Sequence, residues 1–208
     1  RDVTKEDLIT NLANATESNP IDVTWAVMNP YFGAYCDIPL WTGDYTTYNG
    51  VDNNKCIEQW NRTFDMYQTI TGLPNGVYKM QCQGFYRMGG GGNDAGAAAT
   101  ARTNGTEVLN AKYYINSSEG TLKSIFDYGF VSSSNTTYNS STAFTVSGNN
   151  CYVPNNLNRA SSCFLSGEYV NEPIRAVVTD GIIKIGFRKT VTSSEDWAAY
   201  DNVTLTYC

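Results

Sequence analysis

The sequence predicts an all-β protein, an antiparallel β-sandwich with a short N-terminal helix. Three observations favour this fold class. The chain is 13% aromatic and only 16% charged, which is typical of many short strands joined by turns. Apolar and polar residues alternate over short segments, and turn residues separate these segments. All-β domains commonly reach about 200–250 residues as one unit, so the chain of 208 residues fits a single sandwich.

The N-terminal segment departs from the strand pattern. Residues 4–16 (TKEDLITNLANAT) combine a capping-box sequence at their start with one short apolar face, and this combination predicts a helix. Pro20 then stops helical geometry. We expect residues 1–22 to be a helix and linker from an upstream segment, and residues 23–208 to form the β-sandwich domain.

The strand pattern begins at Val23 and is clearest in residues 77–88 (VYKMQCQGFYRM). There Tyr78 and Tyr86 fall on one face of the predicted strand, and Arg87 falls on the other, because side chains alternate along a strand. The same alternation returns in the C-terminal third of the chain. The spacing suggests about eight to ten strands.

Two glycine-containing segments lie between the predicted strands. Residues 89–99 (GGGGNDAGAAA) predict a mobile loop, and they lack the Lys-Ser/Thr pair that closes a phosphate-binding loop. Residues 99–110 (ATARTNGTEVLN) predict a β-hairpin, because the Asn-Gly pair at its centre favours a tight turn with positive φ.

Charge and apolar content argue against two kinds of partner. The net charge is −6 and the pI about 4.6, whereas a nucleic-acid surface needs clustered Lys and Arg. No stretch of about 18 apolar residues occurs, so we expect no membrane insertion. The chain begins at Arg1, without an apolar leader. We therefore expect either a removed signal or a segment that is covalently linked to further domains.

The six cysteines are dispersed and show no spacing typical of zinc or thioredoxin-like sites. They are either buried thiols or disulfides formed in an oxidising compartment, and their dispersal in a polar chain favours disulfides. We expect a disulfide between Cys151 and Cys163, and a secreted or cell-surface location.

The absence of histidine removes several kinds of catalysis. Ser-His-Asp and Cys-His nucleophile systems and histidine-ligated metal sites all need this residue. Carboxylate chemistry remains, as in glycoside hydrolysis by two acids. No spacing singles out a pair among the candidate acids Asp37, Asp44, Asp65 and Asp196.

Three tryptophans have the surroundings that sugar binding requires. Pyranose rings stack on flat aromatic side chains, and their hydroxyls bind planar polar groups. Trp41, Trp60 and Trp197 each lie beside such polar residues and turn residues. The alternative is that Trp60 and Trp197 are core residues beneath loops, because Trp is highly buried on average.

Four segments carry a resemblance to a known family, and together they extend from about Val23 to Tyr207. They are residues 28–32 (MNPYF) followed by Trp41, residues 58–87, residues 151–169 and residues 181–207. On these segments the chain resembles the galactose-binding-like carbohydrate-binding domains appended to polysaccharide-utilisation proteins of gut bacteria. The resemblance implies a jelly-roll sandwich, non-catalytic glycan binding and a structural calcium ion.

The resemblance also implies ligands for that calcium ion. Related domains place an acidic residue after an Asn-x-x-Phe start, close to an Asp at the opening of the final strand. Asp201 matches the second position, but Gly33 stands at the first. Calcium takes six to eight oxygen ligands, so backbone carbonyls near Asn29 would have to complete the site. Alternatively, Asp201 is a turn residue that caps the strand.

We predict a module that binds a carbohydrate without cleaving it. The residues expected to stack on or bind the sugar are Trp41, Trp60, Asn61, Tyr86, Arg87, Asp196 and Trp197. One alternative is a structural or adhesion module without a sugar site, in which the tryptophans are all buried. The other is a glycan-active enzyme that uses two carboxyl groups.

Overall fold

The structure is a computed structural model, and it describes most of the chain. The described residues are 4–33, 40–45, 56–90, 95–127 and 143–208. One of the six cysteines, Cys36, lies outside the described residues, and so do the candidate acid Asp37 and residues 91–94 of the glycine-rich segment.

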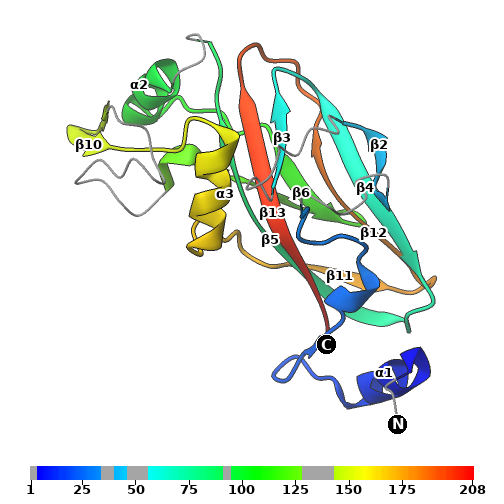
Figure 1. The fold of residues 1–208 in the computed structure, drawn as a ribbon. Helices are drawn as coiled ribbons and strands as arrows, with labels where there is room; N and C mark the ends of the chain where they lie inside the picture. Colours follow the sequence, from blue (N-terminus) through cyan, green and yellow to red (C-terminus); the bar gives the residue numbers. More distant parts are fainter. Residues whose placement is uncertain (1–3, 34–39, 46–55, 91–94, 128–142) are drawn as a thin grey trace.

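Two antiparallel sheets pack face to face, which confirms the predicted β-sandwich (Figure 1). In the larger sheet the order is β1-β13-β5-β11, with β3 also paired to β13 and β8 paired in parallel to β5. Its strands are β1 (Ile21–Asp22), β3 (Ile57–Trp60), β5 (Gly76–Arg87), β8 (Lys123–Ser124), β11 (Ile174–Val178) and β13 (Trp197–Tyr207). The smaller sheet has the order β2 (Thr42–Asp44), β4 (Phe64–Thr71), β12 (Ile182–Lys189), β6 (Lys112–Ile115) and β7 (Ser118–Thr121).

The main core lies between the two sheets. At its centre, the rings of Phe187 and Tyr200 stack with centroids 3.9 Å apart and an interplanar angle of 9°. The predicted alternation in β5 is confirmed, because Tyr78 and Tyr86 both point into this core. The members that matter below are Phe32, Trp41, Tyr78, Tyr86, Phe187, Tyr200, Val203 and Leu205.

A second apolar cluster, the outer core, covers part of the opposite face of the larger sheet. In Figure 1 the helices α2 (Gly96–Asn104) and α3 (Leu157–Leu165) lie on this side, together with the hairpin β9 (Phe144–Val146) and β10 (Asn149–Cys151). The outer core includes Cys56, Phe85, Ala98, Cys151, Leu157, Ala160, Cys163, Phe164, Tyr169, Trp197 and Ala199.

Helix α2 overturns the predicted hairpin at residues 99–110. The Asn-Gly pair that suggested a tight turn instead ends a helix, with Gly105 in the left-handed conformation at φ 68°. The same residue pair suits both structures, because a helix commonly stops at a left-handed glycine. The alanine-rich segment before Gly105 favours the helix, and Ala98 packs into the outer core.

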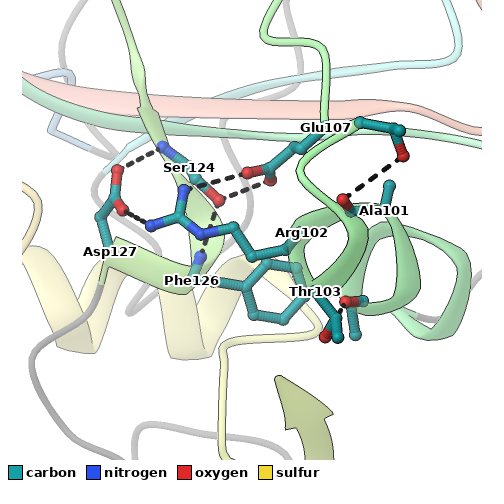
Figure 2. Close-up of polar contacts among 9 residues, drawn as sticks. Ala101, Arg102, Thr103, Glu107, Ser124, Phe126 and Asp127 are labelled. Carbon is teal, nitrogen blue, oxygen red and sulfur yellow. Dashed lines mark hydrogen bonds and ion pairs between the residues drawn. The ribbon is translucent and has the colours of Figure 1, made fainter. Parts of the chain in front are cut away.

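A polar network fastens α2 to the following chain. Figure 2 shows the Arg102 guanidinium between two carboxylates, at 3.0 Å from Glu107 and 2.6 Å from Asp127. Ser124 joins both acids, since its hydroxyl donates to Glu107 and its backbone N–H donates to Asp127. Asp127 ends the short 3₁₀ helix η4 (Ile125–Asp127). Because these charged groups are paired with one another, the network holds the outer layer together.

The predicted N-terminal helix is present as α1 (Lys5–Asn11), and Thr4 with Asp7 forms the capping box. It is followed by the 3₁₀ helix η1 (Leu12–Asn14), and Leu12 reaches the main core. Strand β1 then pairs with the end of β13. That residues 1–22 come from an upstream segment stays a prediction. Within the described residues, a helix with the length and apolar content of a membrane span does not occur.

The predicted disulfide between Cys151 and Cys163 is wrong. Both residues are buried thiols in the outer core, and no bond joins them. Burial raises the pKa of both thiols, so both stay protonated near neutral pH. The two cysteines pack as small apolar side chains, which is a common role for a buried cysteine.

Candidate functional site

Three of the predicted site residues form a row across the larger sheet. Trp197, the first residue of β13, lies directly opposite Trp60 on β3 and directly opposite Arg87 on β5. Residues opposite one another in antiparallel strands point to the same face. The Arg87 guanidinium lies 5.3 Å from the ring centre of Trp60 and 5.6 Å from that of Trp197, so it contacts both indole rings.

This row lines a pocket of about 270 Å³, which we call the Trp60 pocket. Its lining consists of Glu58, Trp60, Arg87, Asn155, Asn156 and Trp197. Trp60 is 38% exposed, whereas Trp197 and Arg87 are almost completely buried. The pocket lies at the border of the outer layer, because Asn155 and Asn156 directly precede α3. Asn156 caps that helix by accepting a hydrogen bond from the Arg159 N–H.

The polar contacts fix the orientation of the pocket's side chains. The indole N–H of Trp197 donates to Glu58 at 2.8 Å, and Arg87 donates to the carbonyl of Glu195 at 3.3 Å. Burial raises the pKa of Glu58, and the hydrogen bond from Trp197 acts in the opposite direction. Groups held in this way are ordered before a ligand arrives, which lowers the cost of binding.

A tight turn before β13 links the pocket to the structure beneath it. Asn61 accepts from the N–H of Glu195 and donates its own N–H to the carbonyl of Asp196, both at 2.9 Å. Asn61 and Glu195 both have positive φ, at 50° and 60°. Below the turn, Asp196 pairs with Lys189, and Tyr86 donates its hydroxyl to the same carboxylate oxygen at 2.7 Å. The buried ion pair therefore anchors the turn that carries Trp197.

Three of the residues predicted to bind sugar are buried and serve the framework. Trp41 is 2% exposed and packs on Phe32 in the main core. Tyr86 is fully buried, and Asp196 is 1% exposed in its pair with Lys189. The predictions for Trp41, Tyr86 and Asp196 are wrong, because each side chain points into the sandwich. Asn61 is exposed, but it holds the turn beside the pocket and is not part of the lining.

Sequence reasoning missed half of the Trp60 pocket. Glu58 lies two residues before Trp60 on one strand, so the period of two could have placed both side chains on one face. Asn155 and Asn156 precede a helix that was not predicted. The signal for that helix was an Asn N-cap followed by apolar residues at helical spacing, from Leu157 to Phe164.

The predicted calcium ligands were compared with what calcium requires. Both polar atoms of the Asn29 side chain are buried with no hydrogen-bond partner in the described part of the chain, so an oxygen is available there. Asp201 is 3% exposed, and burial raises its pKa to about 8. Among the described residues, no cluster of three acidic, Cys or His side chains exists. Two side chains fall short of six to eight oxygens, so calcium at Asn29 and Asp201 stays a prediction.

The acids considered for catalysis do not gather in the Trp60 pocket. Asp44 is exposed and pairs with Arg62, and Asp65 accepts from the hydroxyl of Tyr114 at 2.7 Å. Among the described residues that line the pocket, Glu58 is the one carboxylic acid.

Comparison with known proteins gives structural similarities only. No protein-family model matches the chain, and no curated protein matches it in sequence. The chain is similar in structure to TmCBM61, solved in complex with β-1,4-galactotriose, with 16% identity, a TM-score of 0.42, and coverage of 88% of this chain and 98% of the other. It is also similar to a protein from Bacteroides thetaiotaomicron that is thought to bind sugar, with 10% identity, a TM-score of 0.28, and coverage of 86% and 92%. At these TM-scores the functional case depends on the residues of the Trp60 pocket.

Proposed function

We propose that the protein binds a carbohydrate in the Trp60 pocket without cleaving it. The observation that carries this proposal is the row of Trp60, Trp197 and Arg87. The row lines a pocket whose other lining residues provide one carboxylate and two amides. We further propose that the chain acts as one module of a secreted or cell-surface protein with covalently linked domains.

The pocket offers the two kinds of contact that a sugar needs. The exposed part of the Trp60 ring provides a flat apolar surface for the C–H face of a pyranose. Glu58 accepts hydrogen bonds from hydroxyls, and the amides of Asn155 and Asn156 can both donate and accept them. The lining holds one acidic and one basic side chain, and this balance favours an uncharged sugar.

Retention on immobilised polysaccharides tests the proposal. Affinity electrophoresis of the wild type against a panel of galactans, glucans, mannans and xylans should show retardation in at least one gel. Trp60→Ala should weaken that binding by about tenfold or more, as expected for an aromatic residue at the centre of a site. Leu165→Ala, which removes an exposed side chain on α3, is the matched control and should leave the retardation unchanged.

Other results would select an alternative function. An absence of retardation across the panel would favour a structural or adhesion module. Release of new reducing ends from a retained polysaccharide would favour an enzyme, which needs two carboxyl groups about 5–10 Å apart.

A further inference from the structure

We propose a second carbohydrate-binding site at the other end of β13, built on Trp25 and Tyr31. These residues line a hollow of about 400 Å³, which we call the Trp25 pocket. Its lining consists of Asp22, Thr24, Trp25, Val27, Pro30 and Tyr31. Neither aromatic residue belongs to the Trp60 pocket, so binding at this site can be tested independently of binding at the Trp60 pocket.

The backbone that carries the two aromatic rings is fixed at both ends. Val23 donates its N–H to the carbonyl of Leu205 at 2.8 Å, and Val203 donates to the carbonyl of Pro30 at 2.9 Å. Between these points, Met28 exchanges two hydrogen bonds with the side chain of Gln68 on β4. The segment is therefore bonded to both sheets, and its exposed side chains project from a rigid support.

The local conformation turns the aromatic side chains outward. Residues Thr24–Ala26 form the 3₁₀ helix η2, in which Thr24 is buried and Trp25 is 40% exposed. Phe32 has a φ of 42°, which is unusual for a bulky residue. Its ring is fully buried in the main core, while the preceding Tyr31 is 55% exposed. Burial of the Phe32 ring offsets the strain of its backbone. The neighbouring Tyr31 side chain points outward and lines the Trp25 pocket.

Size argues for a sugar rather than a protein partner. The large apolar side chains exposed on this segment are Trp25, Met28 and Tyr31. If each exposes about half of roughly 200 Å², they offer roughly 300 Å² in total. A stable protein interface buries about 800 Å² from each partner, of which somewhat more than half, roughly 450 Å², is apolar. Two partly exposed aromatic rings around a hollow that also holds the exposed carboxylate of Asp22 suit a pyranose better.

Trp25 also borders a second hollow, so the ligand should be longer than one sugar unit. That hollow measures about 340 Å³ and has Lys5 and Leu8 of α1 on its wall, with Leu73 beyond the end of β4. An oligosaccharide could occupy one hollow, cross the exposed ring and enter the other. The two sites are separated along β13 by roughly 25 Å, at about 3.3 Å per residue, because Trp197 begins the strand and the hydrogen bond between Val23 and Leu205 lies near its other end.

Fluorine NMR of protein labelled with fluorotryptophan tests both sites in one titration. The four tryptophans give separate probes: Trp25 for this site, Trp60 and Trp197 for the first site, and buried Trp41 as internal control. Resonances are assigned with single Trp→Phe variants. The ligands added in the titration are galacto-, gluco-, manno- and xylo-oligosaccharides, from disaccharides to hexasaccharides. We expect the Trp25 resonance to shift saturably, also in the Trp60→Ala variant.

The outcomes separate the two proposals. A saturable shift at Trp60 with none at Trp25 would overturn the second site and leave the first intact. A shift at Trp25 alone would support the second site and contradict the first, and an absence of shifts at all of these residues would overturn both.

Substitution checks the second site independently of the spectra. Trp25→Ala combined with Tyr31→Ala should weaken oligosaccharide binding in the Trp60→Ala background by about tenfold or more, and Leu165→Ala should not. A double variant with unchanged affinity, or one that loses thermal stability instead of affinity, would show that the two rings serve the fold.

Discussion

The two faces of the larger sheet differ in what their side chains contact, although the same strands form both faces. Tyr86 and Arg87 are consecutive in β5, and Asp196 directly precedes Trp197 at the start of β13. Tyr86 lies in the main core and donates its hydroxyl to Asp196, whereas Arg87 and Trp197 line the Trp60 pocket on the outer face. A shift of one residue therefore separates a framework residue from a residue of the Trp60 pocket, because successive side chains of a regular strand point to opposite faces.

The two faces also differ in how they are covered. The smaller sheet closes the inner face, and Trp41 and Tyr86 are buried there. The outer face is covered by α2 and α3, while Trp60 on the edge strand β3 remains 38% exposed. Aromatic residues thus fill space on both faces, since Phe85 and Trp197 are buried in the outer core, but Trp60 at the border of the cover stays partly exposed.

The largest expected contrast between the faces is between two tryptophans. Trp41→Ala should lower the free energy of unfolding by about 3–5 kcal/mol, since it leaves a large cavity in the main core. Trp60→Ala should cost about 1 kcal/mol or less, because it removes a partly exposed ring and one cation–π contact. Urea denaturation measures both values, and equal losses would contradict the distinction between the faces.

The buried ion pair beneath the turn should give the next largest effect. Lys189→Met should cost about 3 kcal/mol or more, because it leaves Asp196 as a buried charge without its partner. Lys189→Met combined with Asp196→Asn should be less costly, since the charge is gone and Tyr86 keeps an acceptor. If urea denaturation shows that the double variant loses as much as the single one, the cost lies in packing.

The buried carboxyl of Asp201 should make stability depend on pH. Burial raises its pKa from 3.8 to about 8, so the folded protein holds a proton that the unfolded chain has released. Stability should therefore fall as pH rises from about 4 to 8 and then level off. Asp201→Asn should flatten this profile and raise the free energy of unfolding at pH 8 in urea denaturation, because the uncharged amide avoids the cost of burying a carboxylate and can still accept from the N–H of Asn202.

The same variant tests the predicted calcium. If calcium binds at Asp201, added calcium should raise the melting temperature of the wild type at pH 8, and chelator should reverse the gain. Asp201→Asn should show little response. A wild type that does not respond to calcium would refute the predicted site.

The smallest effect concerns the helix cap at the Trp60 pocket. Asn156→Ala removes the side chain that caps α3, so thermal denaturation should show a loss of about 1 kcal/mol. Asn156→Asp retains a capping oxygen and serves as the control for stability. If oligosaccharide affinity falls for Asn156→Ala but not for a variant with a similar stability loss elsewhere, Asn156 contacts the ligand.

Sequence patterns predicted the strands better than the outer layer. The alternation in β5 identified Tyr78 and Tyr86 as facing together, and both are in the main core. Local patterns were less informative around Gly105, because an Asn-Gly pair suits a hairpin as well as a helix end. The helix prevails there because Ala98 and its neighbours pack against the outer core.

Three of the residues proposed to bind sugar lie together in the structure, and their role in binding stays a prediction. Trp60, Arg87 and Trp197 were each proposed separately, and the structure places them in one pocket. Trp41 has similar polar neighbours in sequence, but it is buried against Phe32 and Phe187. Trp25 was not proposed at all, because its exposure depends on hydrogen bonds to residues far away in the sequence.

The fold class, the N-terminal helix and the alternation of faces along the regular strand β5 follow from the sequence alone. These features follow from local periodicity and capping, which depend on neighbouring residues alone. The tertiary structure decided which face of the larger sheet stays partly open, and which aromatic residues lie at its border. That choice depends on strand register and on the cover from α2 and α3, both of which arise from contacts between distant parts of the chain.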